Sequence, residues 1–580
     1  MPSKIVILPI LIFTFVLSCV PAAKQAQVQV QATTVVAPPA EAGSFNSEKA
    51  YLEYLLGSEA ELSDKWENAL NHYSTALSLD PASAHIKTQI SKMLIRLDRI
   101  SEAQTRLEEV SKTNPDYVPA LMILGELYNS QRKVDEAIGV YERILKIDPE
   151  KNEPHLFLGI LYASKGDLEK GLSIFGTVLK KDPENIMALY YTASINMDKK
   201  DFDRAEEIFK KITEISPSFD AAYLNLGILY ETKENIAGAE EAYKKVLAIN
   251  PHNLFARERL SKLYISDRSY SKAINELEAI LKQMPRNLDI HQRLGLLYLQ
   301  EKQHDKAVYE FRLVLESRPE DIATRYYLSM VLEELKKYEE AEKELKKIIA
   351  LDPKNINAFL GLGSMHMKKN NYSEAAKTYE ELLGFEKAKP EIYIYLGNAY
   401  LQDKNYAKSE QALREGLRLF SDYDELNFNL AILYEKTGKF EDMIAQLRRT
   451  IEINPKHADA LNYLGYSYVE KGINLQEAQA FIQRALELKP DNGYIIDSLG
   501  WLYFKLGKYE EAVKTLQKAL DIVKEDPVIL EHLGDAYEKL GDNVKALGLW
   551  NEALKSGEKE EGLIDRVKRK INELAPKIQN

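Results

Sequence analysis

The stretch DAAYLNLGILYETKENIAGAEEAYKKVLAINPHN, from Asp220 to Asn253, decides the fold. Apolar residues recur at helical spacing in two short segments joined by a polar turn; they are Tyr223, Leu226, Gly227 and Tyr230, then Ala239, Tyr243, Val246 and Leu247. Pro251 ends the second segment, because the residue before a proline disfavours the helical region. Helices of about 12–14 residues are marginal alone in water, so the unit must pack against neighbours.

The neighbours are copies of this unit. Prolines recur in eight successive steps of 34 residues, from Pro81 to Pro353. We number the positions of each unit as slots, and slot 8 carries a small residue throughout: Gly57, Ser91, Gly125, Gly159, Ala193, Gly227, Ser261, Gly295, Ser329, Gly363, Gly397, Ala431, Gly465, Gly500 and Gly534. Slot 20 is mostly alanine. Small residues at two helices' crossing point let the backbones approach closely, with a large aromatic such as Tyr243 beside them.

This pattern resembles the tetratricopeptide repeat (TPR) family, with Leu226-Gly227, Tyr230, Ala239, Tyr243 and Pro251 at the family's positions. The resemblance implies an all-α fold, a right-handed superhelical solenoid of helix-turn-helix repeats. About fifteen repeats fill residues 50–560, with starts at residues 50, 84, 118, 152, 186, 220, 254, 288, 322, 356, 390, 424, 458, 493 and 527. Residues 561–580 are expected to form a capping helix and tail, since a solenoid must end without exposing its core.

The first 18 residues have the composition of a signal peptide. Lys4 precedes an apolar run from Ile5 to Leu17, which is short for a membrane span of about 20 residues. Val16-Leu17-Ser18-Cys19 resembles the lipobox of bacterial lipoproteins, and Cys19 is the only cysteine in the chain. The resemblance implies cleavage before Cys19 and lipid attachment there, hence a membrane anchor in a bacterial envelope. The alternative is an uncleaved signal-anchor helix.

Residues 19–49 are predicted to contain the lipidated cysteine and a flexible tether, because they lack a helical apolar stripe and contain Pro-Pro, Gln, Thr and Ala. The Gln/Val alternation at residues 27–31 would suit a strand, but no partner strand is expected. Val20 follows the cysteine in place of the aspartate that favours inner-membrane retention in enteric bacteria. We therefore expect an outer-membrane lipoprotein facing the periplasm.

The repeat pattern is irregular between residues 383 and 424. Pro390 is displaced from its expected place, Ser409 stands in slot 20, and Met443 occupies slot 20 of the next repeat. Two interpretations stay open: tolerated drift, or a local break that divides the array into two arms. Near the C-terminus, a basic cluster is expected on the outer face of the capping helix; it contains Arg566, Lys568, Arg569 and Lys570.

The sequence contains no candidate catalytic, cofactor-binding or metal-binding site. The nine histidines are scattered without a ligand-type spacing, and no P-loop or G-x-S-x-G motif is present. The formal charge of −12 disfavours nucleic acid as a partner, which would need a clustered basic face. We therefore expect a non-enzymatic protein, with small-molecule ligands disfavoured and protein partners docking on it.

In TPR arrays, partners dock on a concave face lined by the first helix of each repeat. The family's inward slots here carry many aromatic residues; the set is Tyr51, Tyr54, Met187, Tyr190, Met197, Tyr326, Met330, Tyr466, Val469, Tyr494, Trp501 and Phe504. Exposed Trp, Tyr and Phe have hot-spot composition. Either Trp501 is exposed and binds partners, or neighbouring helices or the cap cover it. A carboxylate-gripping TPR subtype is disfavoured, because Asn225, Asn398, Asn429 and Asn462 are scattered.

The C-terminal third resembles bacterial outer-membrane TPR lipoproteins that act as periplasmic adaptors. Its matching elements are Asp497–Trp501 (DSLGW), His532–Gly534 (HLG) and Leu549-Trp550. The resemblance implies an adaptor that assembles envelope proteins, for example a processing protease with cell-wall hydrolases. Two alternatives are a component of exopolysaccharide export or of a pilus or secretion machine, and direct polysaccharide binding through the inward tyrosines.

Overall fold

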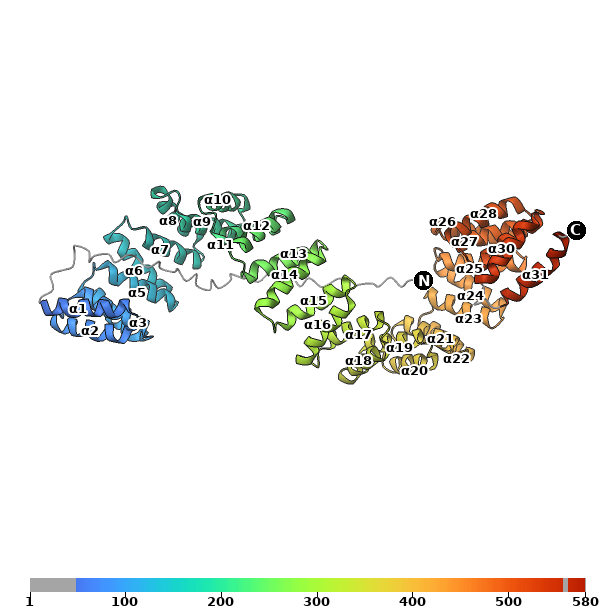
Figure 1. The fold of residues 1–580 in the computed structure, drawn as a ribbon, viewed down its shortest axis with the longest axis horizontal. Helices are drawn as coiled ribbons and strands as arrows, with labels where there is room; N and C mark the ends of the chain where they lie inside the picture. Colours follow the sequence, from blue (N-terminus) through green and yellow to red (C-terminus); the bar gives the residue numbers. More distant parts are fainter. Residues whose placement is uncertain (1–47, 557–561, 579–580) are drawn as a thin grey trace. The chain divides into compact units, whose positions relative to one another are not determined.

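A computed structural model describes residues 48–556 and 562–578. The described residues form 31 α-helices and no strand, and successive helices pair into antiparallel hairpins (Figure 1). The predicted signal peptide, Cys19 and nearly all of the tether lie outside them. The predicted fold class, an all-α solenoid of TPR-type hairpins, is confirmed. The helices divide into two units, which we describe separately. The first unit ends at Pro251, and the second begins at His252.

The first unit contains six hairpins: α1 (Glu48–Leu62), α2 (Trp66–Leu79), α3 (Ala84–Arg96), α4 (Ile100–Thr113), α5 (Val118–Ser130), α6 (Val134–Ile147), α7 (Asn152–Ser164), α8 (Leu168–Lys181), α9 (Ile186–Asp198), α10 (Phe202–Ile215), α11 (Asp220–Thr232) and α12 (Ile236–Ile249). The odd-numbered helix is the first helix of each repeat. From residue 84 onward, a first helix begins at every predicted repeat start.

The second unit contains nine hairpins and one further helix: α13 (Leu254–Ser266), α14 (Tyr270–Gln283), α15 (Leu288–Gln300), α16 (His304–Ser317), α17 (Ile322–Glu334), α18 (Tyr338–Leu351), α19 (Ile356–Lys368), α20 (Tyr372–Leu383), α21 (Pro390–Gln402), α22 (Tyr406–Leu419), α23 (Asp424–Lys436), α24 (Phe440–Ile453), α25 (Ala458–Lys471), α26 (Leu475–Leu488), α27 (Gly493–Lys505), α28 (Tyr509–Ile522), α29 (Pro527–Lys539), α30 (Asn543–Ser556) and α31 (Leu563–Ile578).

Within each unit, first helices of successive repeats come close to one another. Helix α3 contacts α5 and α7 contacts α9 in the first unit, while α21 contacts α23 and α25 contacts α27 in the second. This closeness places the first helices on the inner side of each stack, as expected for a solenoid with a concave binding surface. We call the side chains at slots 2, 5, 9 and 12 of the first helices the inner face.

Most slot-8 glycines face the large residue at slot 24 of the same repeat. A Cβ built on Gly125 would lie 2.7 Å from Tyr141 Cζ, and one on Gly227 would lie 2.4 Å from Tyr243 Cε1. Both tyrosines are fully buried. The predicted role of the small slot-8 residue, close approach between paired helices, is therefore confirmed. Where slot 8 is serine, as at Ser91, slot 24 holds leucine instead.

The turn between the two helices of a repeat adopts a left-handed conformation at slot 15. The dihedral angle φ is 63° at Lys200, 58° at Lys302 and 59° at Asn370, while Gly166, Gly438 and Gly507 occupy the same slot in other repeats. The N-terminus of a first helix is capped by a side chain, as at α13. Asn253 Oδ1 accepts a hydrogen bond from Ala256 N at 2.9 Å and so satisfies an N–H group that has no partner within the helix. Both features are local, and they repeat with the sequence.

The irregular region at residues 383–424 lies inside the second unit. Helix α20 ends at Leu383, two residues earlier than most second helices, and Pro390 begins α21. Buried residues remain continuous across this region, since Leu383 packs against the hydrophobic clusters on both sides. Ser409 fits the crossing because its hydroxyl donates to the Gly397 carbonyl at 2.7 Å. These contacts favour tolerated drift over a break.

Of the helices in residues 48–556 and 562–578, none combines the length and the hydrophobicity required to cross a membrane.

Candidate partner-binding surface

In the first unit, the predicted inner-face residues Tyr190 and Met197 are partly buried. Tyr190 lies edge-on to Phe209 and Phe219, at 6.0 and 5.5 Å between ring centroids, and its hydroxyl accepts a hydrogen bond from Asn225 Nδ2 at 3.2 Å. Met197 packs against the same hydrophobic cluster. Met187 is 40% exposed. Tyr190 and Met197 therefore stabilise the packing of successive repeats, and their side chains are only partly accessible to solvent.

In the second unit, the exposure of the predicted residues varies. Tyr326 and Met330 are half-buried, and burial raises the pKa of the Tyr326 phenol. Tyr494 is the most accessible of the predicted residues, with 56% of its surface exposed. Tyr466 and Phe504 are half-buried, whereas Val469 is fully buried and cannot contact a partner. Tyr494 is thus the clearest binding candidate among them.

Trp501 is only 6% exposed, so the alternative in which neighbouring helices cover it holds. Its indole stacks between Phe504, at 4.5 Å and 6°, and His532 of the next repeat, at 4.0 Å and 11°. The indole Nε1 donates to Glu470 Oε2 at 2.6 Å. A hydrogen-bonded indole held between two rings from separate helices is a structural element, and the expectation of an exposed Trp501 is wrong.

A charged cluster joins the last repeat to α31; we call Glu531, Asp535, Arg566 and Lys570 the cap cluster. Arg566 donates to both carboxylate oxygens of Glu531, at 3.1 and 2.7 Å. Lys570 donates to Glu531 Oε1 at 2.7 Å and to Asp535 Oδ2 at 2.6 Å. Glu531 is 2% exposed. Burial alone would raise the Glu531 pKa, but the two cations outweigh it and hold that pKa below its ordinary value.

The cap cluster corrects the expectation that all four basic residues of α31 lie on its outer face. Arg566 and Lys570 are four residues apart, which places them on one helical face. That face points toward Glu531 and Asp535, also four residues apart on α29. Lys568 and Arg569 are exposed. A signal for this pairing is present in the sequence: the acids Glu531 and Asp535, at inward slots, have the same four-residue spacing as the cations Arg566 and Lys570.

His532 is a functional candidate that sequence reasoning left among the scattered histidines. It is 5% exposed, and its Nδ1 lies 2.9 Å from Asp497 Oδ1 of the preceding repeat. Burial by itself would lower the pKa of His532, but Asp497, with further help from Asp535 and Glu531, outweighs burial and raises that pKa above 6.5. The contact between His532 and Asp497 therefore links α27 to α29 beneath the Trp501 ring.

Two of the asparagines described as scattered are brought together. Asn398 Nδ2 donates to Asn429 Oδ1 at 3.1 Å, across successive first helices. Asn225 lies in the first unit, where it pairs with Tyr190. The pairing of Asn398 with Asn429 joins α21 to α23 through neutral polar groups, and no lysine set of the carboxylate-gripping kind accompanies it in the contacts of these two residues.

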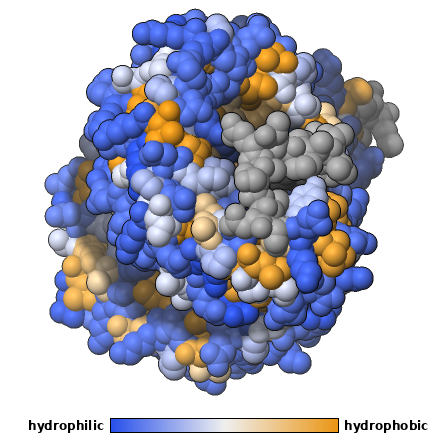
Figure 2. Space-filling view, turned by 90° about the vertical axis from the view of Figure 1, so that its left-hand side faces the viewer, coloured by the Kyte–Doolittle hydropathy of each residue, from blue (hydrophilic) through white to orange (hydrophobic). Residues whose placement is uncertain are grey.

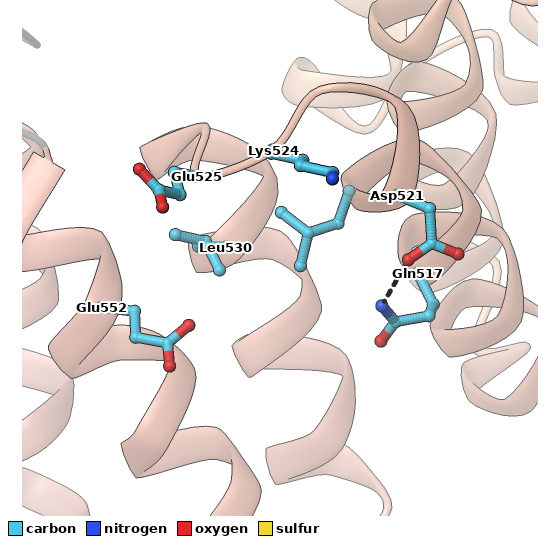
Figure 3. Close-up of a pocket in the computed structure, with 7 residues that line it drawn as sticks. Gln517, Asp521, Lys524, Glu525, Leu530 and Glu552 are labelled. Atoms are coloured by element: carbon cyan, nitrogen blue, oxygen red, sulfur yellow. Dashed lines mark hydrogen bonds between the residues drawn. The ribbon is translucent and has the colours of Figure 1, made fainter.

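The outer surface offers little for chemistry. A shallow hollow of about 420 Å³ lies between α28, α29 and α30 and is lined by Gln517, Leu520, Asp521, Lys524, Glu525, Leu530 and Glu552 (Figure 3). Gln517 Nε2 donates to Asp521 Oδ1 at 3.1 Å, and the remaining charged groups point apart. In the part of the chain that the structure describes, no group of His, Cys, Asp or Glu side chains is arranged to hold a metal ion.

The face in Figure 2 is mostly hydrophilic, with hydrophobic residues in small separate groups.

Comparisons with known families agree with the hairpin geometry. A family model described as tetratricopeptide repeat matches residues 92–152, 158–218 and 428–493, a second of the same description matches residues 196–251, 232–294 and 332–393, and a model described as TPR repeat matches residues 500–541. The chain belongs to the tetratricopeptide repeat family. A further model, described as anaphase-promoting complex, cyclosome, subunit 3, matches residues 266–348 of this TPR array.

Two solved structures are similar to the TPR array at low identity. One is a crystal structure of the APC/C hetero-tetramer Cut9-Hcn1, with 14% identity over 90% of this chain and 96% of that chain and a TM-score of 0.35. The other is a structure of Naa15/Naa10 bound to HypK-THB, with 14% identity over 90% of this chain and 100% of that chain and a TM-score of 0.33. No curated protein sequence matches the chain significantly.

Replacing Trp501 by alanine is expected to destabilise the last TPR repeats by about 3–5 kcal/mol, because a buried indole and its stacking partners are lost. Amide hydrogen exchange should accelerate in α27 and α29 while α1–α12 keep their protection. Tyr494→Ala serves as the control, since an exposed side chain contributes little to stability. Unchanged exchange in α27 and α29 of the Trp501 variant would contradict the buried, structural role.

The emission of Trp501 is expected to change with pH. Because the folded pKa of His532 is raised, the imidazolium contributes stability that is fully present below pH 6.5 and is lost as pH rises through the folded pKa. We expect Trp501 fluorescence, measured in a Trp66→Phe, Trp550→Phe background, to increase as pH rises through the folded pKa of His532. The reason is that a stacked imidazolium quenches indole emission more than neutral imidazole does. Asp497→Asn should shift the transition to lower pH, and a transition that Asp497→Asn leaves in place would contradict the pairing.

Proposed function

We propose that this TPR protein is a non-catalytic scaffold, anchored by lipid on Cys19 to the bacterial outer membrane and facing the periplasm, where it assembles cell-envelope proteins. The observation that carries the scaffold role is the row of first helices, which presents an inner face with an accessible Tyr494 and with half-buried Tyr466 and Phe504. Accessible aromatic residues on a rigid surface offer a large contact area at a small cost in conformational entropy. The clients we propose are a processing protease and cell-wall hydrolases.

The anchor is supported by the sequence alone, through the apolar run and the single cysteine at its end. Metabolic labelling with a fatty-acid analogue tests it directly: the wild-type chain should take up label and fractionate with the outer membrane, whereas Cys19→Ser should do neither. Label in the Cys19→Ser variant would reject lipidation at this residue. Recovery of labelled chain with the inner membrane would reject the outer-membrane assignment.

The client proposal is tested by site-specific photo-crosslinking in cells, with the crosslinker in place of Tyr494. Tyr309, which is 61% exposed on the second helix α16, is the matched control because it lies off the inner face. Adducts to a protease and to hydrolases at residue 494, and not at residue 309, support the proposal. Adducts to an outer-membrane channel or secretin, or to glycan alone, would replace the adaptor role with export or polysaccharide binding.

A further inference from the structure

Helix α1, at the N-terminal edge of the first unit, carries an open apolar stripe. Leu52, Leu55 and Leu62 are 56%, 43% and 78% exposed. These residues, together with Glu48 and Glu59, fall on one face of the helix at spacings of three and four residues. A row of three exposed leucines is unusual on the solvent-exposed face of a 15-residue helix.

The same position is buried in later repeats of both units. Leu52 occupies slot 3, and its counterparts are all buried; they are Ile86, Ala120, Pro154, Ala188, Ala222, Ala256, Ile290, Thr324, Ala358, Ile392, Leu426, Ala460, Ile495 and Ile529. In the first unit, two of them are buried by the second helix of the preceding repeat: Ile86 clusters with Tyr73 and Ala76 of α2, and Ala120 with Leu107 and Val110 of α4. The open stripe of α1 therefore has the geometry of a seat for one more helix.

The opposite end of the array shows how such a seat is filled. Helix α31 covers the last repeat, with Leu563, Val567 and Leu574 buried against Trp550 and Ala546 of α30. Its charged residues complete the fit through the cap cluster. A helix that combines a leucine-type row with basic side chains opposite acids is thus the solution this chain itself uses at a solenoid end.

The open stripe of α1 is acidic as well as apolar. Slot 10 carries Glu59 here, where the following repeats of the first unit place Met93, Leu127, Leu161, Ile195 and Leu229. Glu59 and Glu48 are exposed on the stripe, whereas Glu53 and Glu61 face α2 and bond to His72 at 2.8 Å and to the Tyr73 hydroxyl at 2.7 Å. Covering the stripe requires a cation opposite Glu59, because a buried carboxylate without a partner is costly.

We propose that the open face of α1 binds an amphipathic helix of a partner protein, whose leucine-type row packs on Leu52, Leu55 and Leu62 and whose lysines or arginines pair with Glu48 and Glu59. A second copy of α1 would bring the same acids together, and an anionic lipid surface would repel them. The preceding residues 20–47 contain Pro38-Pro39 and lack a helical apolar stripe, so they do not have the sequence of this occupant. The inference is independent of the lipid anchor and of the inner face.

The probe is a synthetic helical peptide of about 20 residues, long enough to form helix on binding, with a leucine row flanked by lysines. A second peptide replaces each lysine by glutamate. We expect the full-length chain to bind the basic peptide at least about tenfold more tightly than the acidic one, measured by fluorescence anisotropy. Leu52→Lys should weaken binding of the basic peptide by about tenfold or more, since leucine burial is lost. Leu351→Lys, at a position 43% exposed on α18, should not.

Charge reversal tests the stated chemistry. Glu59→Lys should remove the preference for the basic peptide, because the stripe then carries one acid, Glu48, and one cation. Equal binding of the two peptides by the wild-type chain, or an unchanged preference in Glu59→Lys, would overturn the proposal.

A photo-crosslinker in place of Leu62 identifies what occupies the face. Adducts that carry the mass of the basic peptide support the proposal. Adducts of twice the chain mass that persist with peptide present would show a second copy in the seat, and intramolecular crosslinks to residues 20–47 would show the chain's own segment there. Either result, or crosslinking to lipid alone, would overturn the proposal.

Discussion

Gly125→Ala is expected to destabilise the third repeat by about 1–3 kcal/mol, although alanine is the better helix former. The added Cβ would lie 2.7 Å from Cζ of Tyr141, and that ring is fully buried. Helices α5 and α6 would have to separate, which loses contacts along the whole hairpin. Thermal unfolding followed by circular dichroism, together with hydrogen exchange in α5 and α6, measures the loss.

The same repeat provides a matched control. Gly139 lies in α6, and a Cβ added to it would meet nothing within 4 Å, so Gly139→Ala should stabilise by up to about 1 kcal/mol through helix propensity alone. A rescue is also expected: the second repeat pairs Ser91 with Leu107, so adding Tyr141→Leu to Gly125→Ala should recover part of the loss. If Gly125→Ala and Gly139→Ala behaved alike, close packing against Tyr141 would not be the reason for the glycine.

Lys570→Met is expected to loosen α31 and to destabilise the C-terminal end by about 2–3 kcal/mol. Lys570 bonds to two buried carboxylates, Glu531 and Asp535, and Asp535 loses the cation bonded to it in the variant. Burial already raises the pKa of Asp535, and Lys570 offsets part of that cost. Methionine keeps the apolar stem, so the loss isolates the charge. Limited proteolysis after residue 556 and hydrogen exchange in α31 measure the release.

Lys568→Met is the control for the capping helix, because Lys568 is exposed on the same helix two residues away. Its effect should stay within about 0.5 kcal/mol. Equal protease resistance of the two variants would mean that apolar contacts of Leu563, Val567 and Leu574 hold the cap without the ion pairs.

The sequence predicted the repeat architecture well, because each repeat depends mainly on contacts within itself and with the next copy. A 34-residue period, a small slot 8 and a proline stop are local facts, and the structure places a first helix at each start from residue 84 to residue 527. The left-handed slot 15 was not predicted. Lysines such as Lys200 and Lys302 stand there as well as glycines, so residue type alone does not reveal the conformation.

The candidate surface was predicted less well, because exposure depends on residues from other repeats. Of the residues predicted at inward slots, Tyr494 is accessible as a binding residue must be, whereas Val469 is buried. Trp501, on the same helix, is covered by His532, which belongs to the following repeat. No pattern within the Trp501 repeat indicates that contact.

The amino-acid sequence by itself determined the class of fold, the number and limits of the hairpins, and the motif around Cys19, since all of these follow from local spacing and composition. Only the tertiary structure decided which aromatic residues face solvent, where Arg566 and Lys570 find their acids, and that the stripe of Leu52, Leu55 and Leu62 stays open. The physical reason is that burial is a property of neighbours: it is set by which helix packs over a residue, and that helix is encoded elsewhere in the chain.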